Sequence, residues 1–282
     1  MSPSAAKRPR AILVTGASSG IGLASAANLV QKGFQVFGGV RPGKDHTHLS
    51  AAGVRPVSLD VTDAESLAAA LETVQNQLGD SRLWGLVNCA GVVSAGPVEM
   101  HNLSEARSVF DVNVMGVLAT TQTFLPLIRQ EGGRVVNVSS LSGLLAMPFM
   151  GPYNASKAAL ESLSDTMRRE LKPFGVDVIA IQPGTTKTSM WNKAEQIDVT
   201  SYKGTPYEHA AAKLKDEAVR KGLRGQAPDQ VAAAVVRAFT AKRPPTRIRV
   251  QRKRLSFLFY SLLPFLSDRV IDRKIIEAVW GR

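Results

Sequence analysis

Short apolar runs alternate with longer amphipathic stretches along most of this chain. The apolar runs predict strands at residues 11–15, 34–40, 54–59, 83–87, 134–138, 176–181 and 247–251. Apolar positions at helical spacing predict helices between them, at residues 20–32, 104–128 and 152–171. Strands that alternate with helices are typical of a parallel sheet covered by helices on both faces. We therefore expect a single α/β domain with a Rossmann-like, doubly wound sheet of about seven strands.

Local signals predict where two further helices begin. Thr62 and Glu65 stand three residues apart in a capping-box pattern, which predicts Thr62 as the N-cap of a helix. Residues 205–208 have the pattern of another capped start, and Gly222 or Gly225 would end that helix. This second helix belongs to a polar insertion at residues 189–226, which interrupts the regular alternation after the sixth predicted strand.

The net charge of +12 is unevenly distributed over the 282 residues. The first ten residues contain Lys7, Arg8 and Arg10, and residues 242–282 contain eleven Lys and Arg against three acidic residues. The chain therefore divides into a basic arm (1–10), a nearly neutral body (11–251) and a basic, then apolar, then amphipathic tail (252–282). A DNA-binding domain spreads its basic residues over a reading surface, so we expect no nucleic-acid partner.

Cysteine and histidine usage limits the chemistry further. Cys89 is the sole cysteine, which excludes an internal disulfide framework and a multi-cysteine metal site. The four histidines are scattered, so no metal site is expected. The first ten residues lack the apolar segment of a secretory signal, and no apolar run reaches the roughly 20 residues of a membrane-spanning helix. We therefore expect a cytoplasmic protein.

The strongest local signal is a glycine cluster at residues 15–22, with the spacing G-x-x-x-G-x-G from Gly16 to Gly22. The cluster leaves the first predicted strand and enters the first predicted helix. Glycines allow a tight turn and a close approach to a pyrophosphate, which the free N–H groups at a helix N-terminus bind. Structural turns also need glycine, but the strand–turn–helix setting favours a dinucleotide site.

A second signal is the pair Tyr153 and Lys157, which stand four residues apart and hence on one face of a helix. A nearby ammonium group favours the ionised phenol, so we expect the pKa of Tyr153 to be lowered and its hydroxyl to exchange a proton with a substrate. Taken alone, the pair also suits a surface tyrosine beside a solvated lysine. Upstream, the Ser140 hydroxyl is able to polarise a carbonyl oxygen. The amide of Asn113, in an apolar helix, needs partners, and we expect a water among them.

Together these residues resemble the short-chain dehydrogenase/reductase family over about residues 11–251, and in particular its branch of retinol and hydroxysteroid dehydrogenases. The resemblance implies that Tyr153 is the general acid/base and that Ser140 holds and polarises the substrate oxygen. It implies that Lys157 lowers the pKa of Tyr153 and bonds the nicotinamide ribose. It also implies that Asn113 holds the water of a proton relay.

The resemblance further implies which residues contact a nicotinamide dinucleotide. They come from the glycine cluster, the ends of the later strands and the helix of Tyr153, and they are Gly16, Ser18, Ser19, Gly20, Ile21, Gly22, Arg41, Asp60, Val61, Asn88, Ala90, Gly91, Tyr153, Lys157, Pro183, Gly184, Thr186 and Thr188. The family usually has Asn-Asn-Ala-Gly after the fourth strand, whereas this chain has Cys89 at the second position. We expect Cys89 to be a small buried apolar residue. Either the bracing of the sheet is looser at this position, or other packing replaces it.

The residue after the second predicted strand favours NADP. An acidic residue there would accept the ribose 2′-hydroxyl of NAD. This chain instead has Arg41, which is able to pair with a 2′-phosphate, and Ser18 and Ser19 are further candidate contacts. The alternative is a solvated arginine in a loop, in which case NAD is the cofactor.

The expected substrate contacts are mostly apolar. They are Ser140, Tyr153, Val92, Met147, Phe149, Met190 and Trp191, with Val93 and Leu141 nearby. They predict a hydrophobic ketone, aldehyde or secondary alcohol. The resemblance to retinol and hydroxysteroid dehydrogenases implies a substrate of steroid, retinoid or other lipid type. Several also suit ordinary core packing, and Lys187 and Lys193 leave a carboxylate-bearing substrate open. Residues 189–226 are expected to form a lid that excludes water from this site.

The tail begins with a basic cluster at residues 252–254, which an apolar, aromatic stretch follows. Residues 252–266 are too few to span a bilayer as a helix, but they suit peripheral contact with an anionic membrane surface. The alternative is that this stretch caps the substrate entrance or a subunit interface. The family resemblance implies a homodimer or homotetramer.

The resulting hypothesis is an NADP(H)-dependent oxidoreductase that transfers a hydride between nicotinamide and a hydrophobic carbonyl or alcohol. An NAD-dependent alcohol dehydrogenase of the same fold is the first alternative. A dinucleotide-sensing protein without catalysis is the second, and the presence of both Tyr153 and Lys157 argues against it.

Overall fold

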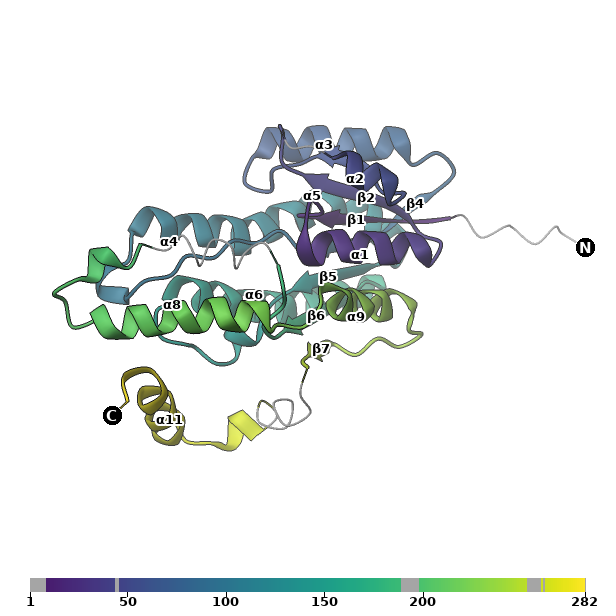
Figure 1. Cartoon of the computed structure of the whole chain (residues 1–282). Helices are drawn as coiled ribbons and strands as arrows, with labels where there is room; N and C mark the ends of the chain where they lie inside the picture. The colour runs from purple at the N-terminus through teal and green to yellow at the C-terminus, as the bar shows by residue number, and fades with distance from the viewer. Residues whose placement is uncertain (1–8, 44–45, 189–197, 253–259, 261, 282) are drawn as a thin grey trace, which may run out of the picture.

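The computed structural model describes residues 9–43, 46–188, 198–252, 260 and 262–281 of the chain. At its centre is a seven-stranded sheet with the order β3-β2-β1-β4-β5-β6-β7, in which every neighbouring pair is parallel (Figure 1). The strands are β1 Arg10–Thr15, β2 Gln35–Val40, β3 Arg55–Ser58, β4 Arg82–Asn88, β5 Arg134–Val138, β6 Asp177–Pro183 and β7 Arg247–Val250. This sheet confirms the predicted fold class. Its strand order reverses between β1 and β4, and doubly wound folds bind ligands at that point, beyond the carboxyl ends of the strands.

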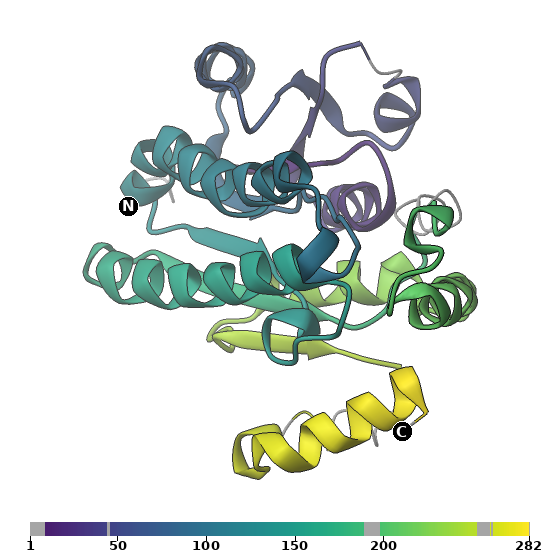
Figure 2. The same ribbon diagram turned by 90° about the vertical axis from the view of Figure 1, so that its left-hand side faces the viewer.

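Helices cover both faces of the sheet (Figure 2). They are α1 Gly20–Gln31, α2 Thr47–Ala51, α3 Ala64–Gln77, α4 Leu103–Phe110, α5 Gly116–Gln130, α6 Gly151–Leu171, α8 Glu208–Leu223, α9 Pro228–Thr240 and α11 Asp268–Trp280. One hydrophobic cluster joins the sheet to α1 and α9, and a second joins its other face to α3, α5 and α6. The sheet is therefore enclosed between two apolar layers.

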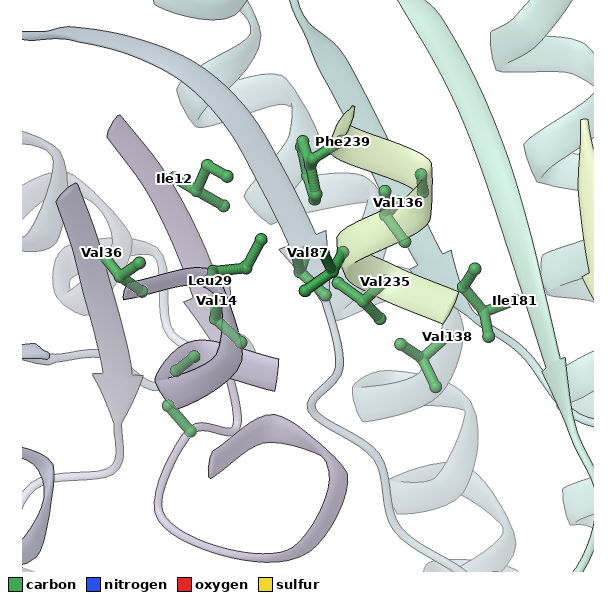
Figure 3. Close-up of a cluster of buried hydrophobic side chains, with 14 of the residues drawn as sticks. Ile12, Val14, Leu29, Val36, Val87, Val136, Val138, Ile181, Val235 and Phe239 are labelled. Atoms are coloured by element: carbon green, nitrogen blue, oxygen red, sulfur yellow. The ribbon is translucent and has the colours of Figure 1, made fainter. Parts of the chain in front are cut away.

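The strands contribute side chains to both layers. In β1, Ile12 belongs to the cluster under α1 and α9, whereas its neighbour Leu13 belongs to the cluster on the opposite face. Figure 3 shows the first cluster, in which Leu29 of α1 and Phe239 of α9 lie beside the central strands. Strands buried on both faces need apolar residues at successive positions. This requirement explains why the strands were predicted from continuous apolar runs, within about two residues of their observed ends.

The helix predicted at residues 104–128 is divided in the structure. α4 ends at Phe110, a π-helical turn spans Asp111–Met115, and α5 begins at Gly116. The widened turn carries Asn113, whose fully buried amide is hydrogen-bonded to the loop after β4. The change in helical pitch therefore occurs where a side chain contacts residues distant in sequence. Hydrophobic periodicity alone does not reveal such a turn.

Two local predictions need correction or completion. The N-cap of α3 is Asp63, whose carboxylate accepts from Glu65 N at 3.0 Å. Thr62 is not the cap, because its hydroxyl donates to Asp60 Oδ1 at 2.7 Å. α9 was not predicted from the sequence, although it supplies part of the core. The insertion helix α8 was predicted, and it ends at Leu223.

The tail contains a helix that lies at the edge of the molecule, beyond β7 (Figure 2, yellow). A 3₁₀ turn at Leu263–Phe265 precedes this helix, α11, and Gly281 closes it with a φ of 71°. Residues 253–259 and 261 of the predicted basic and apolar stretch lie outside the described residues. Within the described ranges, no helix combines the length and the apolar character that crossing a membrane requires.

Candidate active site

The glycine cluster forms the turn between β1 and α1. Gly16 and Gly20 have φ values of 65° and 55°, a region that glycine enters without strain. A Cβ on Gly22 would stand 2.1 Å from Gly16 O, and a Cβ on Gly16 would stand 2.8 Å from Ala90 Cα. The turn therefore needs glycine for space as well as for conformation. It leaves the first N–H groups of α1 at the carboxyl edge of the sheet, where they are able to bind a phosphate.

The segment after β4 is held over this turn by hydrogen bonds. Cys89 N and Ala90 N donate to Thr15 Oγ1 at 3.0 and 3.1 Å. Asn88 Nδ2 donates to Asn137 Oδ1 of β5 at 2.9 Å. These bonds brace the centre of the sheet without an asparagine at position 89, so the structure shows no loosening of this support.

Cys89 packs against the α1 and α9 cluster and is partly buried. Exclusion from water raises the pKa of its thiol to about 12, which the Lys157 ammonium opposes. The thiol is therefore protonated near neutral pH, which agrees with the prediction of an apolar rather than a reactive cysteine.

Tyr153, Lys157 and Ser140 come together beside this segment. Tyr153 and Lys157 project from the first turns of α6, and Ser140 follows β5. The hydroxyls of Tyr153 and Ser140 are hydrogen-bonded to each other. Lys157 Nζ lies 5.9 Å from the centre of the Tyr153 ring and donates to Val138 O at 2.9 Å. The structure thus brings together three of the four residues that were expected to perform the chemistry.

The electrostatics of this group differ from the expectation. Burial raises the pKa of Tyr153, and the hydrogen bond with Ser140 opposes the shift. Burial also lowers the pKa of Lys157 to about 8, which Cys89 and Glu161 oppose. The structure therefore contradicts the expected lowering of the Tyr153 pKa by Lys157: desolvation dominates, and the opposing contribution comes from Ser140. An ammonium with a pKa of about 8 is partly neutral just above physiological pH.

Asn113, the fourth expected residue, is fully buried and already has protein partners. Its Nδ2 donates to Val92 O at 2.9 Å and to Ser156 Oγ at 3.0 Å, and its Oδ1 accepts from Val92 N at 2.9 Å. Both N–H groups of the amide thus donate to protein acceptors. This differs from the expectation that a water is among the partners of Asn113. The side chain ties the loop after β4 to the first turns of α6. A Cβ on Gly91 in that loop would lie 3.8 Å from Lys157 Nζ.

Arg41 follows β2 and is exposed beside the carboxyl end of β3. The neighbouring Asp60 accepts hydrogen bonds from Thr62, which, with the Arg41 charge, lower the pKa of its carboxyl group. Ser18 lies in the glycine turn, and its carbonyl oxygen is 3.0 Å from His48 Nε2 of α2. No sequence pattern predicts this contact, because a single histidine in a short helix carries no motif.

The loop after β6 reaches back to the glycine turn. Gly184 N donates to Val250 O of β7 at 2.9 Å, and Thr186 Oγ1 donates to Gly184 O at 3.0 Å. A Cβ on Gly20 would lie 3.1 Å from the Thr188 methyl group. Gln226 Nε2 donates to Thr186 Oγ1 at 3.2 Å, so the Thr186 hydroxyl positions this loop. Of the expected dinucleotide contacts here, Thr188 is the one that adjoins the glycine turn.

The expected substrate contacts that the structure describes come from the segments after β4, β5 and β6 and from α6. Val92, Val93, Met147 and Phe149 are partly buried, Leu141 is buried and Lys187 is exposed. Met190, Trp191 and Lys193 lie outside the described residues. A polar pair in the loop after β4 was not predicted: Ser94 Oγ and His101 Nε2 share a hydrogen bond of 2.9 Å. The two residues are seven positions apart in a loop, where no periodicity indicates contact.

A buried ion network extends along α6 from Lys157. Glu161 Oε2 accepts from Gln182 Nε2 at 3.0 Å and from Arg247 Nε at 2.9 Å. Arg247 Nη2 also lies 2.8 Å from Asp165 Oδ1. The spacing of 153, 157, 161 and 165 places all four side chains on one helical face, a signal that was present in the sequence but not used. The negative charge of Glu161 favours the protonated form of Lys157.

The chain is similar in sequence to known proteins. Residues 10–198 match the family model described as short chain dehydrogenase. An NADPH-dependent 3-dehydrocapnine reductase of Ornithobacterium rhinotracheale is 35% identical over 275 residues, which cover 94% of this chain and 95% of that protein. A bovine 17-beta-hydroxysteroid dehydrogenase type 6 is 40% identical over 201 residues, covering 69% and 63% of the two chains.

Solved structures agree with these sequence matches. A short chain dehydrogenase/reductase from Burkholderia phymatum in complex with NAD has a TM-score of 0.73 and 26% identity, covering 90% of this chain and 92% of that one. A short chain dehydrogenase from Burkholderia cenocepacia in complex with NADP has a TM-score of 0.72 and 25% identity, covering 96% and 98%. This chain is therefore an oxidoreductase that belongs to the short-chain dehydrogenase/reductase family.

Proposed function

We propose that the protein is an NADP(H)-dependent oxidoreductase that transfers a hydride between nicotinamide and a hydrophobic ketone, aldehyde or secondary alcohol. The observation that carries this proposal is the convergence of Ser140, Tyr153 and Lys157 beside the glycine turn and Ala90. A bound nicotinamide dinucleotide would supply or accept the hydride. Its phosphates would be held by the first N–H groups of α1, which the glycine turn leaves at the carboxyl edge of the sheet.

The chain's own residues would handle the oxygen and the proton. In reduction, Ser140 donates a hydrogen bond to the carbonyl oxygen, and Tyr153 delivers a proton to it as it becomes an alkoxide. The raised pKa of Tyr153 suits reduction, because the phenol stays protonated until the developing alkoxide accepts its proton. Lys157 would bond the ribose and supply positive charge. Asn113 would keep Val92 and α6 in place, which assigns it a positioning role.

Arg41 supports NADP as the cofactor. It is exposed at the end of β2, where a 2′-phosphate would be within reach of its guanidinium. Ser18 and Ser19 in the adjoining turn are candidate further donors. A relative described as NADPH-dependent and a similar structure that contains NADP support this assignment. The similar structure with NAD keeps NAD as the alternative, in an enzyme that oxidises an alcohol.

The apolar side chains near Tyr153 support a hydrophobic substrate of steroid, retinoid or other lipid type. Val92 follows β4, Met147 and Phe149 precede α6, and all three are partly buried. A relative described as a hydroxysteroid dehydrogenase supports the same class. The insertion at residues 189–226 would close over the substrate, so bound cofactor and ketone should protect it from proteolysis. Unchanged cleavage in the ternary complex would count against a lid.

The test is NADPH oxidation by the full-length protein with steroid ketones, retinal, aliphatic aldehydes and small polar ketones. Tyr153→Phe should lower turnover by about 100- to 10,000-fold, because it removes the acid and keeps the ring. NADPH binding, measured by its fluorescence, should persist. Tyr260→Phe is the matched control and should retain activity.

Equal activity of Tyr153→Phe and wild type would overturn the assigned mechanism. The wild type would be better explained as a dinucleotide sensor if it showed no turnover in either direction, with NADPH or NAD, and still bound the dinucleotide.

The tail supports a second part of the proposal, peripheral contact with a membrane through residues 252–266. Phe265 is 84% exposed and Leu262 is 47% exposed, in a segment that Arg252 precedes. Sedimentation with anionic vesicles should deplete the full-length protein from solution, and Phe265→Ser should leave more of it soluble. Equal soluble fractions would favour the alternative, in which this stretch caps the entrance or a subunit contact.

Analytical ultracentrifugation would test the proposed dimer or tetramer.

A further inference from the structure

Phe149 has a backbone conformation that is unusual for a bulky residue. Its φ is 65°, and it is the one non-glycine residue with a positive φ among the residues that the structure describes. Such a conformation is costly for an aromatic residue and persists where surrounding contacts impose it. Phe149 stands four positions before Tyr153, in the loop that leads into α6. The strain therefore lies next to the candidate reacting group.

Two hydrogen bonds impose this conformation. Gly96 N donates to Phe149 O at 2.8 Å, and Asn154 Nδ2 donates to Met147 O at 2.8 Å. Gly96 also pairs with Met150 in an isolated β-bridge. The loop is thus tied both to the segment after β4 and to α6. With the backbone held on either side, the direction of the Phe149 side chain is determined.

The Phe149 ring is directed towards two other aromatic rings. It meets Tyr207, at the start of α8, edge to face, with 6.0 Å between ring centres and an angle of 86°. It lies 6.4 Å from the ring of Trp280, the last residue of α11. Tyr207 is itself anchored, because its hydroxyl donates to Glu99 Oε2 at 2.7 Å. Three segments far apart in sequence therefore form one aromatic cluster beside the loop that leads to Tyr153. We call this part of the molecule the substrate side.

α11 is docked on the body at this cluster. Its residue Val279 is buried, whereas Ile276, one turn earlier, is 46% exposed. α11 packs against α8, and Figure 1 shows it beside that helix. Trp280 is 38% exposed, so part of its ring is available to a ligand. The end of the tail therefore places a partly exposed aromatic ring beside Phe149.

We propose that α11 closes the substrate side of the active site through Trp280, which makes Trp280 a specificity residue for large apolar substrates. The proposal rests on the proposed function. The part of a substrate that extends from the reacting carbonyl past Phe149 would contact the Trp280 ring. A small ketone, held by Ser140 and Tyr153 alone, would not reach it. The tail thus selects substrates by size although it lies far from Tyr153 in sequence.

The experiment compares a short and a long linear methyl ketone as substrates of the full-length enzyme with NADPH. Trp280→Ala should raise KM for the long ketone about tenfold and leave KM for the short one within about twofold, because only the former loses an apolar contact. Trp280→Phe should retain most of the wild-type KM. Ile276→Ala, on the exposed face of the same helix, is the matched control. NADPH affinity should be equal in all variants.

Equal KM ratios for the two ketones in wild type and Trp280→Ala would overturn the proposal, as would the same loss in Ile276→Ala. Amide hydrogen exchange in the loop at residues 147–150 is the second readout. Trp280→Ala should accelerate this exchange, and unchanged exchange would show that α11 does not dock on the loop. This readout needs no turnover. A wild type inactive on every ketone would therefore refute the proposed function separately from the docking of Trp280.

Discussion

The dinucleotide side and the substrate side of the active site are built in different ways. On the dinucleotide side, backbone approaches backbone: a Cβ on Gly22 would stand 2.1 Å from Gly16 O. On the substrate side, the rings of Phe149, Tyr207 and Trp280 meet from three distant segments. Close backbone contact admits only glycine, whereas a contact between rings accepts many pairs of side chains. The first side therefore has a sequence motif, and the second has none.

We expect the largest effect from a substitution that disrupts the dinucleotide side and leaves the substrate side intact. Gly22→Ala places a methyl group against backbone that cannot move without opening the turn, so the affinity for NADPH should fall on the order of 100-fold. Gly204→Ala, in the insertion at residues 189–226, is the control: its φ of 74° also strains an alanine, but a Cβ there would meet nothing within 4 Å, so the affinity for NADPH should be retained. Titration of NADPH fluorescence measures both. Similar affinities for the two variants would contradict the distinction between the sides.

The next effect concerns the partly buried network around Glu161, which joins α6 to β6 and β7 of the sheet. Glu161→Gln removes the charge that pairs with Arg247, whose side chain is 34% exposed and also contacts Asp165. We expect a loss of about 2 kcal/mol and a fall in Tm of about 5 °C, less than for a fully buried pair. Lys274→Gln breaks an exposed pair with Glu277 in α11 and should leave Tm unchanged. Equal Tm changes in a thermal melt would show that the network is not structural.

A smaller effect would sharpen the assignment of the dinucleotide side. Arg41→Ala removes the cation expected to pair with a 2′-phosphate, so the Kd for NADPH should rise about tenfold. The Kd for NADH should not change, because NADH lacks this phosphate. Lys32→Ala, an exposed cation beyond the end of α1, is the control. A parallel loss of affinity for both nucleotides would refute the role of Arg41.

The smallest effect is a pH dependence at the junction of the two sides. Burial lowers the pKa of Lys157 from 10.5 to about 8, so between these values the unfolded chain binds more protons than the folded one. The free energy of unfolding should therefore rise by about 1 kcal/mol from pH 8 to pH 9 through this group. Above pH 9 the raised pKa of Cys89 opposes it.

Denaturant titrations at pH 8 and pH 9 measure this slope. Lys157→Met should lack the contribution, and Lys172→Met, which replaces an exposed lysine, should keep it. A slope in Lys157→Met as steep as in wild type would mean that another group is responsible.

These differences also explain which features could be predicted. Strands such as β1 were found because burial on both faces requires continuous apolar residues. The glycine turn and the pair of Tyr153 and Lys157 were found because local spacing determines their geometry. Asn113 was found, but its partners Val92 and Ser156 were not, because they come from other segments.

The same limit applies to finer details. Thr62 has the residue type of an N-cap, but its bond to Asp60 leaves that position to Asp63. The direction of the Tyr153 pKa shift was wrong because burial cannot be read from i, i+4 spacing. Both errors arise from contacts or solvent exclusion that the local pattern does not contain.

The sequence by itself determined the alternation of strands and helices, the dinucleotide turn and the pairing of Tyr153 with Lys157, because each depends on residues close together in the chain. Tertiary structure alone decided the strained conformation of Phe149, its contact with Trp280 and the network around Glu161. These features depend on chain segments that become neighbours only when the sheet and its helices are packed. Desolvation, which sets the pKa of Lys157, likewise exists only in the folded protein.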